Sequence, residues 1–164
     1  MKNSAMYAGT FDPITFGHLD LVDRAVQIFD RVVIAVAASP RKGTMFSLEQ
    51  RRVMVSESVT QFPDVEVVTF NGLLVDFAQE IGINLLIRGI RAYADFENEF
   101  QMALTNRKLS PDIETLFMMP QESHSYLSSS VVREVASLGG NISDFVPACV
   151  ASRIREYLAA EKRR

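Results

Sequence analysis

Cysteine, tryptophan and histidine are scarce in this chain of 164 residues, which contains one cysteine, no tryptophan and two histidines. The single cysteine, Cys149, excludes an intramolecular disulfide and a Cys-x-x-Cys redox or zinc site, so we assign it to packing. The sequence also lacks a Walker glycine–lysine loop, a Gly-x-Ser-x-Gly elbow and a His or carboxylate cluster with metal-ligand spacing. These absences argue against hydrolysis by a protein nucleophile or by a protein-bound metal.

Long apolar runs and a strong excess of one charge are missing as well. No stretch approaches the length needed to span a bilayer, and the N-terminus lacks the apolar run of a signal peptide, so we expect a cytoplasmic protein. The net charge is −3 and the basic residues are dispersed. Such a chain has no electrostatic footprint for nucleic acid or for an anionic membrane, and any phosphate that it binds is expected to belong to a small molecule.

The hydrophobic content of 48% is sufficient for a full core, and the length predicts one domain over residues 1–164. Apolar segments rich in β-branched residues alternate with helical patterns, which favours right-handed crossovers between parallel strands. We therefore predict an α/β fold: a doubly wound, Rossmann-like parallel sheet of five strands flanked by helices. The expected strands are residues 5–8, 32–37, 65–70, 85–87 and 114–118.

Capping and stop signals define the expected helices. Apolar residues from Leu19 to Phe29 recur at spacings of three and four, which predicts a helix that starts near His18. Ser47 and Gln50 form a capping-box pattern for a second helix. With glycine and proline as stops, the helices after the first are expected at about 47–62, 73–81, 93–110, 128–138 and 147–161.

The segment from Gly9 to His18, GTFDPITFGH, follows the first expected strand and opens the first expected helix. An α/β protein builds a phosphate cradle there, because helix N-terminal amides and the helix dipole favour an anion by about 0.3–1 kcal/mol. Gly9 permits close backbone approach, Thr10 offers a hydroxyl, and His18 offers an imidazole donor. The alternative is that the glycines only make a turn and that His18 only finishes the helix end.

Other polar candidates also follow strands, where ligands of parallel sheets bind. Lys42 lies in a loop without apolar periodicity; alone, it is equally a solvated lysine. The serines that precede the apolar positions of a later helix are equally a plain cap. Candidates after the second, third, fourth and last expected strands are Arg41 and Lys42, Leu73 and Leu74, Arg88 and Arg91, and Ser128 to Ser130.

Arg88 and Arg91 lie three residues apart in the segment LIRGIRAYADFENE. Two guanidiniums so close repel each other unless an anion lies between them. Alternatively, they pair with the carboxylates of Asp95, Glu97 or Glu99, and Glu99 could instead accept a hydrogen bond from a ribose or anchor Arg91. A site with many phosphate donors and few bases fits a nucleophile that is already an anion, such as a phosphate monoester attacking a nucleotide phosphate.

The segments GTFDPITFGH and SSSVVR resemble the two signatures, of TxGH and ISSTxxR type, of the nucleotidyltransferase superfamily. Lys42 in ASPRK and the stretch LIRGIRAYADFENEFQMALTNRKL are similar to the bacterial phosphopantetheine adenylyltransferases, and the likeness covers nearly the whole chain. The resemblance implies reversible transfer of AMP from ATP to 4′-phosphopantetheine, giving 3′-dephospho-coenzyme A and pyrophosphate without a covalent intermediate. This is the penultimate step of coenzyme A synthesis.

The resemblance also implies roles for individual residues. The catalytic group would be His18, Thr10, Lys42 and Arg91, with Thr10 and His18 stabilising the pentavalent α-phosphate. Loss of one such donor costs on the order of 10²–10³ in rate. ATP would be bound by Gly9, Thr10, Phe11, His18, Gly89, Ile90, Arg91, Glu99, His124, Ser125, Tyr126, Leu127, Ser128, Ser129 and Ser130. Phosphopantetheine would be bound by Thr10, Lys42, Leu73, Leu74, Arg88, Met102 and Asn106.

Cofactor and assembly are implied by the same resemblance. Mg²⁺ would arrive with ATP and be held by phosphate oxygens and water, with no metal ligand from the protein. Members of the family are typically hexamers, so a homohexamer is expected. The sequence leaves open whether coenzyme A inhibits; inhibition by competition for the site is a hypothesis, because coenzyme A shares the pantetheine arm and the adenylate.

Three positions depart from the family pattern. Ala8 replaces a proline often seen before the first glycine, Asn98 replaces a common aromatic, and His124 replaces a frequent Trp or Tyr near the adenine. They concern base recognition rather than phosphate chemistry, since His124 stacks less area than Trp. Two other hypotheses remain: a sister enzyme acting on nicotinate mononucleotide or an alcohol phosphate, against which Lys42 argues, and a non-catalytic nucleotide-binding module.

Overall fold

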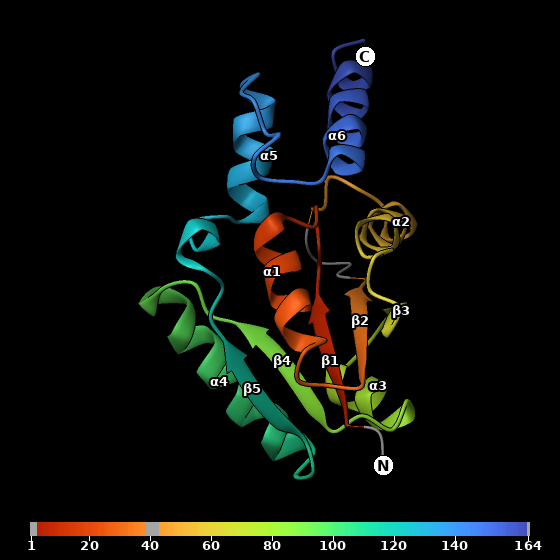
Figure 1. Ribbon diagram of the computed structural model, residues 1–164, viewed down its shortest axis with the longest axis vertical. Helices are drawn as coiled ribbons and strands as arrows, with labels where there is room; N and C mark the ends of the chain where they lie inside the picture. Colours follow the sequence, from red (N-terminus) through yellow and green to blue (C-terminus); the bar gives the residue numbers. More distant parts are fainter. Residues whose placement is uncertain (1–2, 39–42, 164) are drawn as a thin grey trace.

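A parallel sheet forms the centre of the computed structural model, which describes residues 3–38 and 43–163. Five strands lie in the order β3-β2-β1-β4-β5, and every neighbouring pair is parallel (Figure 1). They occur where the apolar segments predicted them. The strands are β1 (Ser4–Gly9), β2 (Arg31–Ala37), β3 (Val65–Phe70), β4 (Leu85–Gly89) and β5 (Glu114–Met118).

Helices follow each strand and cover both faces of the sheet. In Figure 1, α1 crosses the near face, whereas α5 and α6 extend beyond the ends of the strand arrows. The helices are α1 (Phe16–Ala25), α2 (Leu48–Ser58), α3 (Leu74–Glu80), α4 (Tyr93–Leu109), the short 3-10 helix η1 (Glu122–His124), α5 (Ser129–Ser137) and α6 (Ala148–Glu161). None of those in the described ranges is both long and apolar enough to cross a bilayer.

The two faces of the sheet carry separate apolar layers, because alternate residues of a strand point to opposite sides. Ala5 and Tyr7 of β1 belong to the layer that includes α1, α2, α5 and α6. Met6 and Ala8 belong to the opposite layer, which includes α3, and α4 contacts α3 and β5. The predicted doubly wound α/β fold, with helices on both faces, is therefore confirmed.

The order in which strands are added creates a crevice. The chain builds β2 and β3 on one side of β1 and then places β4 on its other side, so the carboxyl ends of β1 and β4 meet at a topological switch point. Ligands of such sheets bind there. Gly89, the last residue of β4, lets α1 approach closely, since a Cβ at this position would lie 2.6 Å from Leu21 Cδ1. The N-terminus of α1 is thereby set against the crevice.

Serine caps and a glycine stop are confirmed as helix boundaries, whereas α2 ends at Ser58 and does not continue up to Pro63 as expected. Ser47 and Gln50 form the expected capping box of α2, and the Ser128 hydroxyl accepts the Val131 N–H at the start of α5. Gly82 follows α3 with a φ of 69°, a conformation that glycine adopts without strain. These local signals identify the starts of α2 and α5 and the end of α3 without reference to tertiary contacts.

The expectation for α1 was too long. The apolar stripe continues to Phe29, but the helix ends at Ala25, because the Gln27 N–H bonds the Arg24 carbonyl and tightens the chain into a turn. Phe29 is nevertheless 5% exposed and packs in the core. The side chain keeps the buried position that the periodicity indicated although its backbone is no longer helical.

Candidate active site

A cavity of about 650 Å³ opens at the carboxyl edge of the sheet, at the switch point between β1 and β4. Residues from the ends of β1, β2, β3 and β4, from α1 and from the start of α5 line it, so segments distant in sequence converge on one space. Predicted site residues that line it are Gly9, Thr10, Phe11, His18, Leu74, Arg88, Gly89, Arg91, Glu99, Leu127, Ser128, Ser129 and Ser130.

His18 is locked in place by the first turn of α1. Thr15 caps this helix, and its backbone N–H donates to His18 Nδ1 at 3.0 Å, which closes a capping box. Accepting that bond requires an unprotonated Nδ1, so a neutral ring carries its proton on Nε2. The imidazole is therefore a fixed donor through Nε2–H.

The surroundings of His18 keep its ring uncharged. Burial, with the positive charges of Arg91 and Arg88, lowers the pKa of His18 from 6.5 to about 4. The ring packs edge-on against Phe11 at a centroid distance of 5.2 Å, and the Tyr7 ring lies at 6.4 Å. At neutral pH the uncharged His18 ring can thus donate a hydrogen bond to an anion. It is poorly suited to supply a full positive charge or to act as a general acid.

Arg88 lies directly in the crevice and is fixed by Glu99. Its Nε and Nη2 each donate to the Glu99 carboxylate at 2.6 Å, and Nη1 donates to the Ala8 carbonyl at 2.7 Å. Burial alone would lower the pKa of Arg88, but the hydrogen bonds and charge of Glu99 raise it on balance. These bonds use three of the five guanidinium N–H groups, which leaves two for a ligand.

Arg91 makes a comparable set of contacts closer to the surface. Its Nε and Nη2 donate to Asp95 at 2.9 and 3.1 Å, and Nη1 donates to the Leu127 carbonyl at 3.0 Å. Burial favours protonation of Asp95, but the bonds from Arg91 lower its pKa on balance. Of the carboxylates considered from the sequence, Glu99 thus pairs with Arg88 and Asp95 pairs with Arg91.

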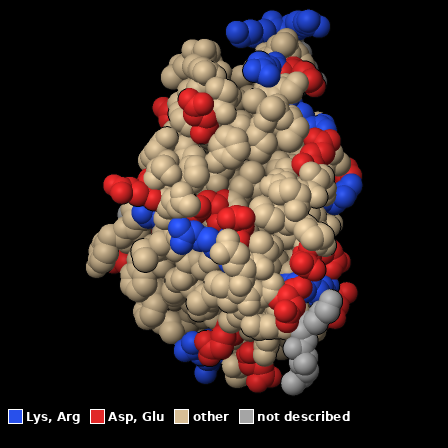
Figure 2. All heavy atoms as spheres, viewed as in Figure 1, with Lys and Arg blue, Asp and Glu red and all other residues tan. Residues whose placement is uncertain are grey.

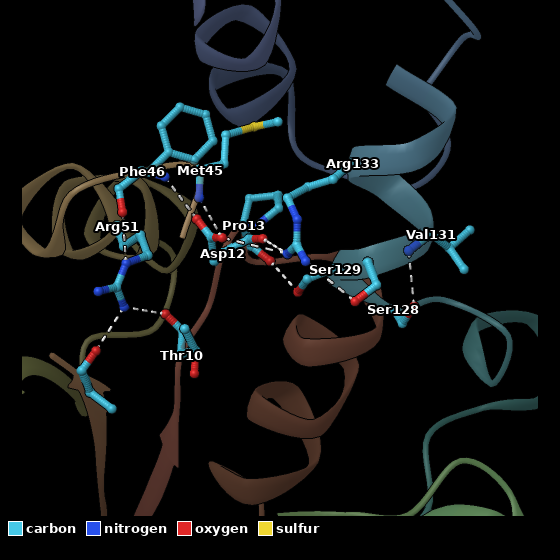
Figure 3. A network of polar contacts seen from close by, with 12 residues as sticks. Thr10, Asp12, Pro13, Met45, Phe46, Arg51, Ser128, Ser129, Val131 and Arg133 are labelled. Carbon is cyan, nitrogen blue, oxygen red and sulfur yellow. Dashed lines mark hydrogen bonds and ion pairs between the residues drawn. The ribbon is translucent and has the colours of Figure 1, made fainter. Parts of the chain in front are cut away.

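The loop from β1 to α1 is tied to the start of α5 (Figure 3). The Ser129 hydroxyl donates to the Pro13 carbonyl at 2.8 Å, and Arg133 donates to the Asp12 carbonyl. Arg133 also contacts the Ser130 hydroxyl at 3.4 Å. These bonds hold the amides at the α5 N-terminus beside the phosphate cradle predicted at α1, giving two helix N-termini at one cavity.

Two buried charged residues of this region were missed in the sequence. The Asp12 carboxylate accepts the backbone N–H groups of Met45 and Phe46 at 2.8 and 3.0 Å, which joins the β1–α1 loop to the segment before α2. Arg51, in α2, is 1% exposed. The signal was present for Arg51, since it shares the spacing of the buried α2 residues Met54, Val55 and Ser58. Asp12 offered no such signal.

Several predicted site residues lie outside the lining of the cavity. Leu73, Met102 and Tyr126 are 55%, 52% and 61% exposed, respectively. His124 places Nδ1 4.0 Å from the carboxylate of Asp20 in α1. Lys42 falls outside the described residues. The predicted residues that do not line the cavity are Leu73, Ile90, Met102, Asn106, His124, Ser125 and Tyr126.

Acidic and basic side chains are interspersed on the face drawn in Figure 2. Burial raises the pKa of the Tyr7 hydroxyl well above its ordinary value although Arg88 and Arg91 oppose this, so the phenol stays neutral. Arginines and helix N-termini therefore supply the positive potential of the site.

Comparison with known proteins places this geometry in context. The profile of the cytidylyltransferase-like family matches residues 6–135. A phosphopantetheine adenylyltransferase from Hahella chejuensis is 50% identical over 160 residues, which cover 98% of this chain and 99% of that protein.

Solved structures agree on the fold at low sequence identity. The crystal structure of a candidate nicotinate-nucleotide adenylyltransferase from Vibrio parahaemolyticus gives a TM-score of 0.70 at 17% identity, covering 98% of this chain and 94% of that one. A lipopolysaccharide core biosynthesis protein from Thermoplasma volcanium gives 0.52 at 19% identity, covering 74% and 98%. At such identities the likeness concerns the fold alone.

Proposed function

The chain belongs to the cytidylyltransferase-like family and, within it, to the phosphopantetheine adenylyltransferases, and we propose that it transfers the adenylyl group of ATP reversibly to 4′-phosphopantetheine. The products are 3′-dephospho-coenzyme A and pyrophosphate. The observation that carries the chemistry is the neutral, capped His18, fixed with one N–H donor beside two arginines in the cavity.

The reaction is a direct in-line displacement. A phosphate oxygen of the acceptor forms a bond to the α-phosphorus of ATP, and the bond from this phosphorus to the pyrophosphate oxygen breaks. Because the nucleophile is already an anion, no protein base is required, and Nε2–H of His18 with the Thr10 hydroxyl stabilises charge on the pentavalent α-phosphate. Arg91 and the α5 N-terminus at Ser128 to Ser130 then hold the β- and γ-phosphates.

The acceptor is assigned to the side of the cavity occupied by Arg88. The two N–H groups that Glu99 and Ala8 leave available on Arg88 suit a phosphate monoester. Lys42 is proposed to bind the same phosphate, and Leu73, Leu74, Met102 and Asn106 to contact the pantetheine arm. The adenine and ribose are assigned to Gly89, Ile90, Glu99 and the segment from His124 to Leu127.

Mg²⁺ is proposed to enter with ATP, where it neutralises phosphate charge as the adenylyl group is transferred. The carboxylates of the cavity support this assignment, because Asp12 is bonded to two backbone N–H groups and Glu99 to Arg88. The described residues contain no group of three or more His, Cys, Asp or Glu arranged to hold a metal ion. We propose that phosphate oxygens and water hold the ion, with no metal ligand from the protein.

We further propose a homohexamer in the cytoplasm. The exposed side of α4 supports self-association, because Tyr93, Phe96, Phe100 and Leu104 are 84%, 39%, 45% and 49% exposed, and contiguous apolar surface of this kind marks an interaction site. Size-exclusion chromatography with light scattering should give six times the mass of the chain. A monomer at micromolar concentration would contradict the assembly without affecting the proposed reaction.

Pyrophosphate release tests the reaction directly. Purified protein with ATP and Mg²⁺ is given 4′-phosphopantetheine, nicotinate mononucleotide or no acceptor. We expect release with phosphopantetheine alone, and we expect coenzyme A to inhibit competitively because it shares both halves of the product. Pyrophosphate release with nicotinate mononucleotide instead would show that the acceptor is wrong although the reaction type is right. No release with either acceptor would contradict the proposed function.

A further inference from the structure

Arg51 is the most deeply buried charged side chain among the described residues, with 1% exposure. It lies on the inner side of α2, and no carboxylate forms a hydrogen bond or ion pair with it in the described ranges. A buried guanidinium has a large desolvation cost unless its N–H groups are satisfied. Its position therefore depends on the acceptors that surround it.

Those acceptors are backbone carbonyls from three segments (Figure 3). Nη1 donates to Thr10 at 2.6 Å and to Ala37 at 2.8 Å, Nη2 donates to Ala38 at 3.2 Å, and Nε donates to Phe46 at 3.2 Å. One side chain thus joins the loop after β1, the carboxyl end of β2 and the segment before α2. The planar guanidinium is the side chain that can donate in several fixed directions at once.

The bond to Thr10 fixes the direction of a peptide at the active cavity. In a trans peptide the carbonyl and the following N–H point to opposite sides, and the Thr10–Phe11 peptide is trans. With the Thr10 carbonyl held by Arg51, the Phe11 N–H points away from Arg51. This N–H has no acceptor in residues 3–38 and 43–163, and both Thr10 and Phe11 line the cavity.

Phe11 also has a backbone conformation that an isolated chain disfavours, with φ at 48°. The surrounding contacts must maintain it. Asp12 supplies some of these contacts by binding the N–H groups of Met45 and Phe46, and Arg51 supplies others by binding the Phe46 and Thr10 carbonyls. Both side chains therefore connect the loop after β1 to the segment before α2. Asp12 does so as an acceptor of N–H groups, and Arg51 does so as a donor to carbonyls.

We propose that Arg51 is a positioning residue for adenylyl transfer, which holds the Thr10–Phe11 peptide so that the Phe11 N–H is presented to the transferring phosphate. This inference rests on the proposed function and adds to it a residue that does not line the cavity. Arg51 itself touches no substrate; its effect is transmitted through the peptide that it binds.

The test compares Arg51→Met with Arg52→Met. Methionine keeps an unbranched apolar side chain but removes all donors, whereas Arg52 is the adjacent residue of the same helix and only pairs with exposed Glu49. We expect kcat of Arg51→Met to fall about 10–100-fold, as for loss of other supporting partners of a site, while KM for both substrates changes less than about threefold. Arg52→Met should match the wild type.

Arg51→Lys provides the conservative variant. Its ammonium keeps the charge and can donate to Thr10 and Ala37 but lacks the fork that reaches Phe46, so its kcat should lie between those of the wild type and Arg51→Met. If Arg51→Met fails to fold, a kcat of Arg51→Lys below that of the wild type still supports the proposal. A kcat of Arg51→Lys and Arg51→Met equal to that of the wild type overturns the proposal.

Hydrogen–deuterium exchange gives a readout independent of the acceptor. In Arg51→Met, or in Arg51→Lys if the former does not fold, residues 9–15 should exchange faster while residues 4–8 and 31–35 keep wild-type protection. Faster exchange of the whole sheet would show general destabilisation and overturn the proposal, as would unchanged exchange in residues 9–15. If the wild type released no pyrophosphate with phosphopantetheine, the proposed function would fail while exchange still decided the role of Arg51.

Discussion

The two ring nitrogens of His18 have different roles, and both follow from its place at the third position of α1. Nδ1 accepts the Thr15 N–H and completes the capping box, whereas Nε2–H remains for a ligand. Glutamine at this position makes the ordinary capping box after threonine. The structural and chemical contributions of His18 can therefore be separated by substitution.

We predict that His18→Gln and His18→Ala both lower kcat by on the order of 10²–10³, because each removes the fixed imidazole donor at the α-phosphate. Only His18→Ala should leave the Thr15 N–H without its side-chain acceptor, while the Thr15 hydroxyl still caps the helix, at a cost of about 0.5–1.5 kcal/mol in the free energy of unfolding. Steady-state kinetics and urea denaturation of the two variants measure these effects. Near wild-type turnover in His18→Gln would show that the imidazole has no part in the chemistry.

Glu99 offers a second prediction at this scale, since it binds Arg88 in a bidentate pair. Glu99→Gln removes the charge and one acceptor, which leaves Arg88 less firmly oriented, so KM for phosphopantetheine should rise about tenfold, the effect of losing roughly 1.4 kcal/mol. KM for ATP should rise as well, because Glu99 is also assigned to the ribose. A rise confined to KM for ATP would contradict the role of Glu99 in orienting Arg88.

Secondary-structure elements were predictable wherever their signals were local. The β-branched segments identified all five strands, and Ser47, Ser128 and Gly82 marked helix ends through their own hydrogen bonds or φ angles. The end of α1 was not predictable, because Phe29 keeps the helical spacing of apolar residues while lying beyond the helix. Periodicity reports which side chains are buried, and the backbone can reach the same burial by a turn.

Contacts between elements were the part that the sequence could not provide. Asp12 binds backbone N–H groups 33 and 34 residues away, and no local pattern distinguishes such a carboxylate from an exposed turn aspartate. Arg88 had three candidate carboxylates in one segment, and only packing of α4 against β4 and β5 decides for Glu99. Candidate site residues were thus predictable by type and strand end, whereas their partners required the tertiary structure.

Asp12 therefore yields a prediction about how elements are joined. Asp12→Ala leaves the Met45 and Phe46 N–H groups without an acceptor and removes the ion-pair partner of Arg133, 3.5 Å away. Each unsatisfied buried group costs about 1–3 kcal/mol, so the free energy of unfolding should fall by about 2–5 kcal/mol. Urea denaturation measures it, with exposed Asp23→Ala as the control. A loss equal to that of the control would mean that water replaces Asp12 without cost.

At the scale of the whole molecule, the site exists because β4 is added beside β1 after β3 has been completed. That reversal brings Gly9 and Gly89 together and sets the N-termini of α1 and α5 around one cavity. The cavity concentrates positive charge from Arg88 and Arg91 around a neutral histidine. Because folding brings these groups together, the proton affinity of His18 differs between the folded and unfolded protein, and the free energy of unfolding depends on pH.

The direction of that dependence follows from His18. Its pKa is about 4 in the folded protein and near 6.5 in an exposed chain, so between these values the unfolded state binds a proton that the folded state does not. The free energy of unfolding then rises with pH across this window. We predict that the contribution of His18 is fully present above about pH 6.5 and is progressively lost as the pH falls towards 4.

Urea denaturation of the wild type and His18→Gln between pH 4.5 and 7.5 isolates this contribution. Glutamine keeps the capping acceptor but does not titrate, and the carboxylates and His124 are common to both proteins, so their effects cancel in the difference. The wild type should lose more stability than His18→Gln as the pH falls through this range. Parallel curves would mean that His18 titrates alike in the folded and unfolded chain, and a neutral, buried imidazole at the cavity would then be wrong.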